Sequence, residues 1–458
     1  MFKLLLINPS ESRKKKSGLG AFKSSSIAPL SLAYVASLTP ETYSIRIVDE
    51  NIEILDFPDA DLVGITSFTP QIRRAYEIAT HYREKSTPVV MGGIHVSMVP
   101  DEALKYCDTI VIGEAEPVWN EVLRDFERGS LRRTYKGEPV SLDRLPVPDR
   151  SLFKGGYLWD SILTSKGCPM DCNFCSVTRF NGRKFRRRPT ADVINELSTI
   201  KSKFCWVLDD NFLGYGDKEW LTEFFNKIIE LKIKKYFFIQ ASMKLGEDKI
   251  LLRLAYRAGV RVALIGIEST DKESLKQYNK KLNTSYADQG VYLSLIRNIR
   301  KAGIAVLGCF ILGGDSDKIE SFHQTLSFIN RAHIDVLQLS KPTPLPGTAF
   351  FQQLNDASRI MDTNFPDAWR KYTFTRILYE PKNLKIDDVY EGFHYLRSNY
   401  YSTPQRLRRL LFTLMDTKSL SSTLVSILLD KTYRKSWKNS ELFKDYGAHY
   451  LKHKFFIP

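Results

Sequence analysis

Short apolar runs alternate with longer amphipathic segments over the first 135 residues of the chain. The runs are four to six residues long and are bounded by Gly, Pro, Asn or Asp: Phe2–Ile7, Ser44–Val48, Leu62–Thr66, Pro88–Met91 and Thr109–Ile112. Helix-length segments such as Gln71–Lys85 and Pro117–Arg128 lie between them. Apolar strands that alternate with helices are typical of a parallel sheet covered on both faces. The pattern predicts a Rossmann-like α/β domain over residues 1–138, with a ligand site at the carboxyl ends of its strands.

A proline-rich segment, Pro139–Arg150, follows this domain and predicts a linker over residues 139–156. A second alternating series comes after it, with strands expected at Leu158–Thr164, Trp206–Asp209, Tyr236–Gln240, Val262–Ile267, Ala305–Leu312 and Val336–Ser340. The helices expected between them are Ala191–Lys201, Glu219–Leu231, Lys249–Ala258, Ala287–Ala302 and Ile319–Arg331. Six βα units with right-handed crossovers predict a partial (βα)6 barrel over residues 157–350.

The pattern becomes irregular and mostly helical over residues 351–458, which we expect to form a basic C-terminal region. One helical face there is apolar and is flanked by arginines: Leu407, Leu410, Leu411 and Leu414 beside Arg406, Arg408 and Arg409. From Tyr401 to Pro458 there are 11 Lys and Arg against 4 Asp and Glu, so this region carries about half of the net charge of +15. Solvated surface is the first interpretation of this charge. An anionic substrate or membrane headgroups come second, and nucleic acid last, since no nucleic-acid-binding motif accompanies the charge.

The overall composition is that of a globular protein in water, with 43% hydrophobic and 26% charged residues. No apolar run reaches the roughly 18–20 residues that a membrane span needs. The first residues, MFKLLLINP, are too short an apolar stretch for a signal peptide and fit a buried strand better. We therefore expect a cytoplasmic protein.

Three of the six cysteines lie within eight residues, in the segment Ser165–Ser176. Cys168, Cys172 and Cys175 have CxxxCxxC spacing, which favours metal binding over disulfides in a cytosolic chain. Three thiolates can hold three irons of a 4Fe–4S cluster and leave the fourth iron open to another ligand. A structural zinc site would need a fourth ligand, usually from a second cysteine pair, which the sequence lacks. The other cysteines fit small buried hydrophobic residues.

A basic run, Gly182–Arg188, follows the cysteine segment. It could screen the charge of the cluster thiolates or position an anionic substrate. Because charge runs are more often solvated, we expect it to lie on the surface.

The cysteine segment, with Phe174 before its last cysteine, resembles the radical S-adenosylmethionine (SAM) superfamily. Further matching segments are Val207–Phe212, Leu264–Thr270, Phe310–Asp315 and Thr343–Thr348. The resemblance implies that the open iron chelates the amino and carboxylate groups of SAM, which is then cleaved to a 5′-deoxyadenosyl radical. It implies contacts to SAM from Glu268, Gln240, Asp209, Asp210 and Phe174. Acidic residues at strand ends also cap helices or pair with arginine, and this alternative stays open.

The first domain resembles the cobalamin-binding domain that precedes many radical SAM cores. The matching segments are Ile7–Pro9, Ala28–Ser37, Gly64–Pro70, Gly92–His95 and Gly113–Glu116. The resemblance implies that cobalamin contacts Thr66, Ser67, Gly92, Gly93, Gly113 and Glu114. The DxHxxG signature is absent and Ser10–Ser26 contains no histidine, so we expect cobalamin without a protein histidine as lower ligand. We expect His95 to make a structural hydrogen bond, and a vestigial domain without cofactor stays an alternative.

Together these features are similar to the class B radical SAM methyltransferases. The resemblance implies a 4Fe–4S cluster, SAM and cobalamin, and methylation of an unactivated carbon in a secondary metabolite, lipid or tetrapyrrole. A radical cyclase, rearrangement or C–C coupling enzyme is the alternative, and a non-enzymatic sensor is a weaker one. We expect a small-molecule or lipid-like substrate, an electron donor such as flavodoxin or ferredoxin, no nucleic acid, and peripheral membrane contact through the C-terminal region.

Overall fold

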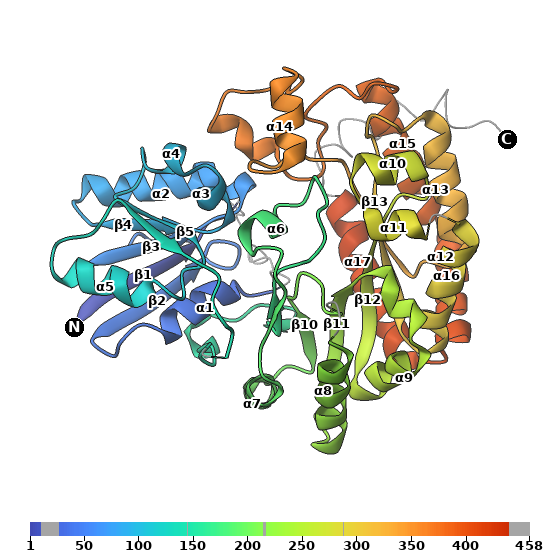
Figure 1. The fold of residues 1–458 in the computed structure, drawn as a ribbon, viewed down its shortest axis with the longest axis horizontal. Coiled ribbons are helices and arrows are strands. Elements are labelled where there is room, and N and C mark those ends of the chain that lie inside the picture. Colours follow the sequence, from blue (N-terminus) through green and yellow to red (C-terminus); the bar gives the residue numbers. More distant parts are fainter. Residues whose placement is uncertain (11–26, 144, 214–216, 287, 439–458) are drawn as a thin grey trace.

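The computed structural model describes residues 1–10, 27–143, 145–213, 217–286 and 288–438. Two parallel sheets lie side by side, each with its own helices, and further helices complete the C-terminal part (Figure 1). Most of Ser10–Ser26, the loop without histidine, and the last 20 residues of the basic C-terminal region lie outside the described residues.

The first sheet has the strand order β2-β1-β3-β4-β5-β6 and is parallel throughout. Its strands are β1 (Phe2–Asn8), β2 (Tyr43–Asp49), β3 (Leu62–Thr66), β4 (Val89–Gly92), β5 (Thr109–Gly113) and β6 (Thr134–Gly137). The helices of this part are α1 (Leu30–Ser37), η1 (Thr69–Gln71), α2 (Ile72–Glu84), α3 (Ile94–Met98), α4 (Pro100–Ala103) and α5 (Trp119–Glu127). Separate apolar clusters cover the two faces of the sheet. The five predicted strands are confirmed, and β6 is an addition that its polar sequence did not indicate.

The second sheet follows chain order, β7-β10-β11-β12-β13-β14, and its strands are all parallel. Its strands are β7 (Asp160–Ile162), β10 (Phe204–Val207), β11 (Tyr236–Ala241), β12 (Val260–Glu268), β13 (Ala305–Ile311) and β14 (Val336–Ser340). The helices between them are α7 (Thr190–Thr199), α8 (Lys218–Glu230), η3 (Met243–Glu247), α9 (Lys249–Ala258), α10 (Lys272–Gln277), α11 (Lys281–Ser285), α12 (Gln289–Lys301) and α13 (Ile319–Arg331). Since β7 and β14 are edge strands, the barrel is open, and the predicted partial barrel is confirmed.

Two short strands lie before and after the three clustered cysteines in the chain. Strands β8 (Ser165–Lys166) and β9 (Arg186–Arg187) pair antiparallel as a separate hairpin. The short helix α6 (Val177–Phe180) lies between these two strands, and η2 (Arg150–Leu152) precedes β7. The hairpin holds the two ends of the cysteine loop together.

The C-terminal region contributes to both halves of the molecule. It contains α14 (Ala349–Asp356), η4 (Asp367–Lys371), α15 (Ile386–Tyr400), α16 (Thr403–Thr417) and α17 (Leu420–Lys438). Val425 and Leu429 of α17 pack against Val262, Leu307 and Val336 on the inner face of the second sheet. In η4, the Trp369 indole N–H donates to the Glu102 carboxylate of the first domain at 3.1 Å. The region therefore fills part of the open barrel and also contacts the first domain. The predicted boundary between residues 350 and 351 stays a prediction.

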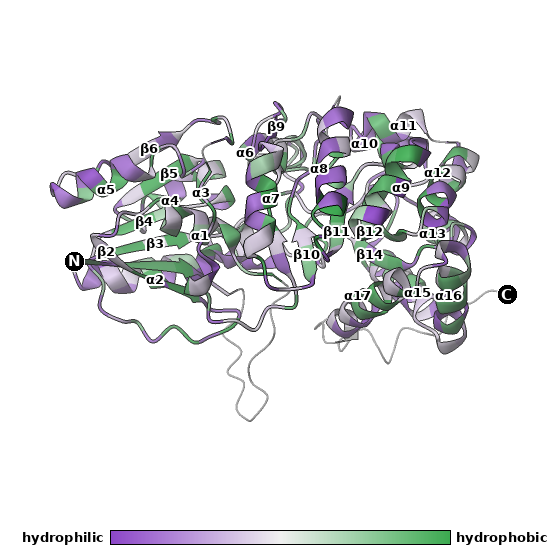
Figure 2. Cartoon of the chain, turned by 90° about the horizontal axis from the view of Figure 1, so that it is seen from below, coloured by the Kyte–Doolittle hydropathy of each residue, from purple (hydrophilic) through white to green (hydrophobic). Residues whose placement is uncertain are grey.

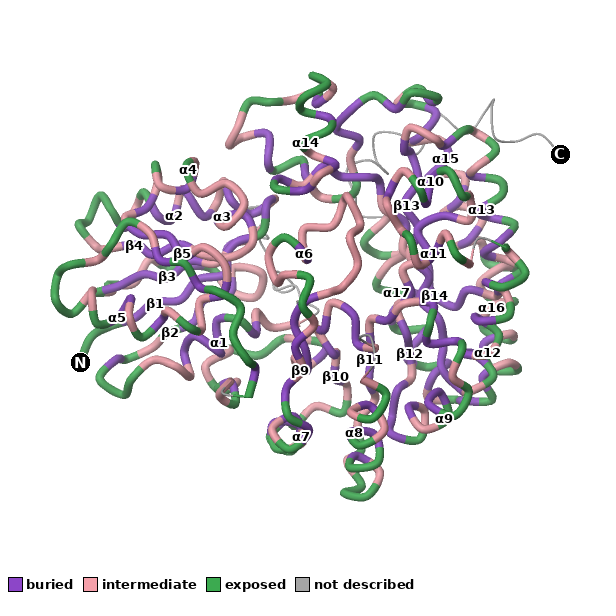
Figure 3. Tube along the Cα trace, in the orientation of Figure 1, coloured by how far each residue is buried: buried purple, intermediate pink, exposed green. Residues whose placement is uncertain are grey.

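The buried residues are concentrated in the two sheets. The strands of both sheets are mostly buried, whereas the outer faces of the helices are exposed (Figure 3). No helix among the described residues is long and apolar enough to cross a membrane.

Candidate functional site

Cys168, Cys172 and Cys175 lie on one loop between β8 and α6. Gly167 starts the loop with a φ of +88°, and a Cβ there would lie 2.4 Å from the carbonyl oxygen of Lys184. Only glycine fits this turn without a shift of the backbone. The Cys168 N–H then donates to the Gly182 carbonyl at 3.3 Å, which ties the first cysteine to the far side of the hairpin.

Residues from the barrel fix the rest of the loop. The Asn173 N–H donates to the Tyr278 carbonyl at 3.2 Å, and its side-chain amide donates to the Gln277 carbonyl at 2.6 Å. The Asn279 side chain donates to the Asp171 carbonyl at 2.6 Å. The loop is thus positioned by the segment after β12, so the cysteines face the carboxyl ends of the barrel strands.

Cys168, Cys172 and Cys175 are all free thiols of intermediate burial. Burial raises the pKa of each, that of Cys175 to about 12, and the nearby Lys280 ammonium acts in the opposite direction. Metal binding deprotonates such thiols. No three His, Cys, Asp or Glu side chains within the described ranges could share a single metal ion. A 4Fe–4S cluster needs no such convergence, because each cysteine binds a different iron, and the donor set fits the cluster.

Glu268 ends β12 in a conformation that non-glycine residues seldom adopt. Its φ is +64°, and the pairing register with β13 shifts between Gly266 and Glu268. The Asn283 side-chain amide donates to the carbonyls of Gly266 and Ile267, at 2.8 and 2.9 Å, and so holds this irregular strand end. Such strain is typical of ligand sites.

The Glu268 carboxylate is paired with a buried lysine. The Lys280 Nζ lies 2.7 Å from Glu268 Oε1. Burial lowers the pKa of Lys280, but Glu268 and Cys172 outweigh that effect and leave it raised. Lys280 therefore stays charged beside the loop that carries Cys168, Cys172 and Cys175, the cluster loop.

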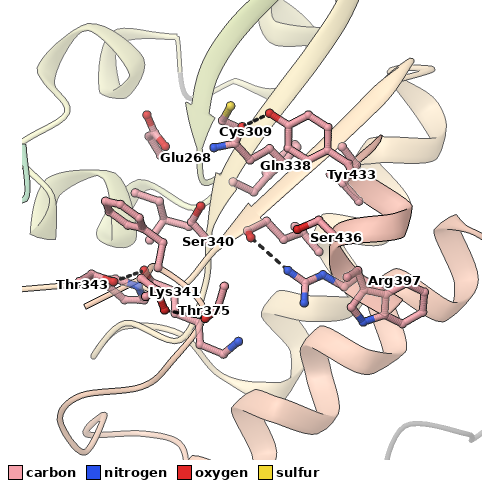
Figure 4. Close-up of a pocket in the computed structure, with 18 of the residues that line it drawn as sticks. Glu268, Cys309, Gln338, Ser340, Lys341, Thr343, Thr375, Arg397, Tyr433 and Ser436 are labelled. Atoms are coloured by element: carbon pink, nitrogen blue, oxygen red, sulfur yellow. Dashed lines mark hydrogen bonds between the residues drawn. The ribbon is translucent and has the colours of Figure 1, made fainter. Parts of the chain in front are cut away.

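A cavity of about 510 Å³ opens at the carboxyl ends of β12, β13 and β14. Phe174 of the cluster loop and Glu268 both line it, as do residues of α15 and α17 (Figure 4). Most of its lining is apolar or aromatic, including Phe310, Leu337 and Trp437. It can hold a SAM-sized or substrate-sized molecule against the cluster loop.

Asp209, Asp210 and Gln240 lie outside the lining of this cavity. Asp209 is fully buried and accepts hydrogen bonds from the Thr164 N–H at 2.7 Å and the Ser165 hydroxyl at 2.5 Å. Asp210 accepts from the Gly167 N–H at 3.2 Å and from the Asn181 amide at 2.9 Å. Burial raises the pKa of Asp210 to about 6. Both carboxylates therefore position the hairpin that carries the cluster loop, while their predicted contact with SAM stays untested.

Gln240 is at the end of β11, where its carbonyl accepts from the Phe212 N–H at 2.8 Å. Phe174 packs edge-on against Tyr278, with ring centroids 5.6 Å apart. Its position in the cavity wall suits the predicted contact with SAM.

The residues predicted to bind cobalamin lie together at the carboxyl edge of the first sheet. Thr66 ends β3 and Ser67 follows it, Gly92 ends β4 and Gly93 follows it, and Gly113 ends β5. A Cβ on Gly93 would lie 2.8 Å from Thr66 Oγ1 and 2.9 Å from the Ser67 nitrogen. The Ser67 hydroxyl is buried without a hydrogen-bond partner in the described structure. Gly93 thus lets β3 and β4 approach closely at this edge, and the unpaired Ser67 hydroxyl fits a polar ligand such as cobalamin.

The Glu114 carboxylate binds cationic side chains of the protein itself. The Arg186 guanidinium binds its carboxylate, with Nη1 donating to Oε2 at 3.1 Å. Lys166 Nζ lies 3.6 Å from the same carboxylate and 2.7 Å from that of Glu116. Glu114 thus connects the first domain to the β8–β9 hairpin. Its predicted contact with cobalamin stays untested.

His95 makes the structural contacts that we expected. Its Nδ1 lies 3.2 Å from Thr69 Oγ1 and its Nε2 3.5 Å from Glu102 Oε1. Burial lowers the pKa of His95. Both ring nitrogens are therefore within hydrogen-bond reach of protein side chains.

The expectation that Gly182–Arg188 is solvated surface is wrong for its last three arginines. Arg186 pairs with Glu114, Arg187 with Asp209 and Asp217, and Arg188 with Glu196. Arg188 is only 1% exposed. The run looked solvated because its acidic partners lie elsewhere in the sequence, where spacing does not reveal them.

Sequence reasoning missed Lys280, Asn283, Lys341 and Arg397, which support or line the site. Lys280 and Asn283 stand shortly after the matching segment Leu264–Thr270, and Lys341 precedes Thr343–Thr348. Proximity to those segments was the signal that could have found them. Nothing in its local sequence distinguishes Arg397.

Comparison with known proteins agrees with this geometry. The B12-binding domain family matches residues 24–123, and the radical SAM superfamily matches residues 162–329. The chain is 30% identical over 427 residues to the bacteriochlorophyllide d C-12(1)-methyltransferase of Chlorobaculum tepidum, covering 89% of each protein. It is 27% identical over 351 residues to the hopanoid C-2 methylase of Rhodopseudomonas palustris, covering 73% of this chain and 65% of the relative.

Among solved structures, the cobalamin-dependent SAM radical enzyme OxsB, with aqua-cobalamin and SAM bound, has the same fold. The TM-score is 0.68 at 14% identity, and the match covers 98% of this chain and 75% of OxsB. The fold, the cysteine loop and the relatives agree on a 4Fe–4S cluster, SAM and cobalamin as cofactors. The chain belongs to the family of cobalamin-dependent radical SAM methyltransferases.

Proposed function

We propose that this enzyme methylates an unactivated carbon of a large, mainly apolar molecule, with a tetrapyrrole as the first candidate substrate. The observation that carries the proposal is the cavity beside the cluster loop, which is lined mainly by apolar and aromatic side chains. The similarity to a bacteriochlorophyllide methyltransferase, 30% over almost the full length of both chains, supports the tetrapyrrole class.

The residues of the chain have separable roles in this reaction. Cys168, Cys172 and Cys175 would hold the cluster, and Phe174 and Glu268 would contact SAM from the cavity wall. Thr66, Ser67, Gly92, Gly93 and Gly113 would border the cobalamin, without a protein histidine as lower ligand. When bound, the cluster with SAM supplies the radical that removes hydrogen, and cobalamin carries the methyl group. Helix α17 packs on the inner face of the second sheet and contributes Tyr433, Ser436 and Trp437 to the cavity wall.

The test is product analysis with the reconstituted enzyme, SAM carrying a CD3 methyl group, and two substrates, bacteriochlorophyllide d and a hopanoid. We expect a CD3 group to replace a hydrogen on the tetrapyrrole, with 5′-deoxyadenosine formed alongside. Labelling of the hopanoid alone would overturn the tetrapyrrole class. An unlabelled cyclised or rearranged product would overturn methyl transfer and favour the radical cyclase alternative.

The electron donor is proposed to be an acidic carrier protein such as flavodoxin or ferredoxin. Arg179, Arg183 and Lys184 are exposed next to the cluster loop and offer it a basic docking surface. A double variant, Arg183→Glu with Lys184→Glu, should slow flavodoxin-driven formation of 5′-deoxyadenosine and leave the dithionite-driven rate unchanged. Equal rates with flavodoxin in both proteins would refute the docking surface.

We also propose a cytoplasmic enzyme that touches a membrane surface through α16 and α17. These helices pack against each other, and Figure 2 shows hydrophobic stretches along both. Their exposed large apolar residues, here called the apolar row, are Leu407, Leu410, Leu411, Leu414, Met415, Leu420, Leu424, Ile427 and Leu428. Exposed cations border the row, among them Arg408, Lys418 and Lys431. An apolar row edged by cations suits anionic lipid headgroups.

Cosedimentation with lipid vesicles tests this contact. The protein should bind phosphatidylglycerol vesicles more strongly than phosphatidylcholine vesicles, and Leu411→Glu with Leu424→Glu should abolish binding. Persistent binding of the double variant would refute the row as the contact surface.

A further inference from the structure

Two cations, Lys341 and Arg397, line the cavity that contains Glu268 (Figure 4). Lys341 directly follows β14, and Arg397 projects from α15. Figure 4 shows Arg397 on the side of the cavity away from Glu268. On the cavity wall that faces the cluster loop, the Glu268 carboxylate is paired with Lys280. The second wall carries the two cations, Lys341 and Arg397.

Lys341 is buried without an acidic partner. It is 2% exposed, and its Nζ lies 3.9 Å from the ring centroid of Phe393 and 4.8 Å from that of Tyr390. No carboxylate within the described part of the chain forms an ion pair with it. Burial, and then the charge of Arg397, hold the pKa of Lys341 well below its usual value. Contacts with ring faces compensate only part of the cost of burying the ammonium.

Arg397 is also without an ion pair among the described residues. Its Nη2 donates to the Leu339 carbonyl at 3.3 Å, and its guanidinium carbon lies 5.4 Å from the Phe393 ring centroid. Burial lowers its pKa to about 10. A guanidinium has five N–H donors, so most of them stay available to a ligand in the cavity.

This pair contrasts with other buried cations of the same protein. Arg188 is bound to Glu196, and Arg300 to Asp335. Burying an unpaired charge costs several kcal/mol unless a partner of opposite sign arrives. Two such cations in one cavity indicate that the partner comes with the ligand.

We propose that Lys341 and Arg397 bind an anionic group, a carboxylate or a phosphate, on an otherwise apolar substrate. This inference deepens the proposed function and rests on it, because it assigns the cavity to the substrate. The anionic group sits at the cation wall, and the apolar skeleton extends along Phe310 and Leu337 toward the cluster loop. The site thereby sets which carbon faces the cluster.

Binding to the reconstituted holoenzyme tests the site. The probes are mesoporphyrin IX, which has two free carboxylates, and its dimethyl ester, with binding followed by porphyrin fluorescence. We expect the acid to bind at least about tenfold more tightly than the ester, as for hydrogen bonds to charged groups. Lys341→Met and Arg397→Met should lose this preference, whereas Arg408→Met, on the exposed surface of α16, should keep it. Inorganic phosphate should displace the acid if a phosphate is the preferred group.

Other outcomes separate the alternatives. Equal binding of acid and ester by the wild type, or an undiminished preference in both variants, would overturn the site. Weaker SAM binding in the variants with unchanged porphyrin binding would assign the cations to SAM and would also overturn it. Charge-dependent binding without methylation of any tetrapyrrole would leave the site standing and refute only the proposed substrate class. Removal of a buried unpaired cation should raise Tm in Lys341→Met, so loss of binding there does not arise from unfolding.

Discussion

Arg186 and Glu114 form a buried ion pair that joins the β8–β9 hairpin to the first domain. Nη1 donates to Oε2 at 3.1 Å, Nη2 contacts Oε1, and the side chains are 8% and 2% exposed. Arg186 Nη1 also donates to the Val140 carbonyl in the linker at 2.7 Å. One guanidinium thus connects three parts of the chain and fixes the cluster loop relative to the edge of the first sheet.

Arg186→Met should therefore destabilise the fold strongly. It leaves the Glu114 carboxylate buried with only Lys166 nearby, and breaking such a pair costs about 3–5 kcal/mol. Urea unfolding measures the loss. Arg183→Met is the control from the same basic run, since Arg183 is 62% exposed and should change the free energy of unfolding by less than about 0.5 kcal/mol. Equal stability of the two variants would contradict the role of the pair.

Gly93→Ala should weaken both the fold and cobalamin binding. Gly93 has φ +96° and ψ 179°, a region open essentially to glycine alone, and the new Cβ would collide with Thr66 and Ser67. We expect a loss of about 1–3 kcal/mol and a reduced affinity for hydroxocobalamin in equilibrium dialysis.

Gly92→Ala is the matched control for this substitution. A Cβ on Gly92 would meet Val111 at an ordinary 3.8 Å, so the free energy of unfolding should stay close to that of the wild type. Destabilisation by Gly92→Ala as large as that by Gly93→Ala would refute the steric argument.

Lys280→Met should lower the reduction potential of the cluster. The Lys280 charge acts on Cys168, Cys172 and Cys175, and a nearby cation favours the reduced, more negative cluster. Loss of one unit charge at an effective dielectric constant of about 20 corresponds to a shift on the order of tens of millivolts. A redox titration followed by EPR measures it. Lys276→Met, an exposed lysine paired with Glu273, should leave the potential unchanged, and an equal shift there would contradict the assignment.

Asp317 makes the stability of the fold dependent on pH. It is 1% exposed beneath the turn after β13, and burial raises its pKa from 3.8 to about 6. The folded state thus holds this proton more tightly than the unfolded state. The resulting stability is complete below about pH 3.8 and is lost as the pH rises through about 6. The difference between the two values corresponds to about 3 kcal/mol.

Asp317→Asn should remove this dependence. An amide oxygen can still accept from the N–H groups of Gly313 and Gly314, and the amide N–H can donate to Ser274. Between pH 4 and pH 7 the wild type should lose stability relative to the variant in urea unfolding. A constant difference over that range would show that Asp317 does not titrate there.

Local sequence patterns were sufficient to predict most of the strands and the cluster loop. All strands of both sheets except β6 follow from short apolar runs, and the cluster loop follows from the spacing of Cys168, Cys172 and Cys175. Strand β6 was missed because TYKG has neither an apolar run nor alternation. Its place in the sheet depends on pairing with β5.

Contacts between distant residues were beyond those patterns. Arg186 and Glu114 are 72 positions apart, so the basic run seemed solvated and the glutamate seemed free for a ligand. Asp209 was placed correctly at a strand end, but its carboxylate points into the hairpin, where Thr164 and Ser165 bind it. The direction of a side chain at a strand end depends on the loop that packs there, which sequence spacing does not define.

The most direct test of radical methylation is a product balance with the reconstituted enzyme, CD3-labelled SAM and the tetrapyrrole substrate. For each methylated product we predict one 5′-deoxyadenosine and one S-adenosylhomocysteine, since one SAM generates the radical and another renews the methyl group. The variant Cys168→Ala/Cys172→Ala/Cys175→Ala should form neither 5′-deoxyadenosine nor methylated product. It should still bind cobalamin. Methylated product from that variant, or product without 5′-deoxyadenosine from the wild type, would contradict the account.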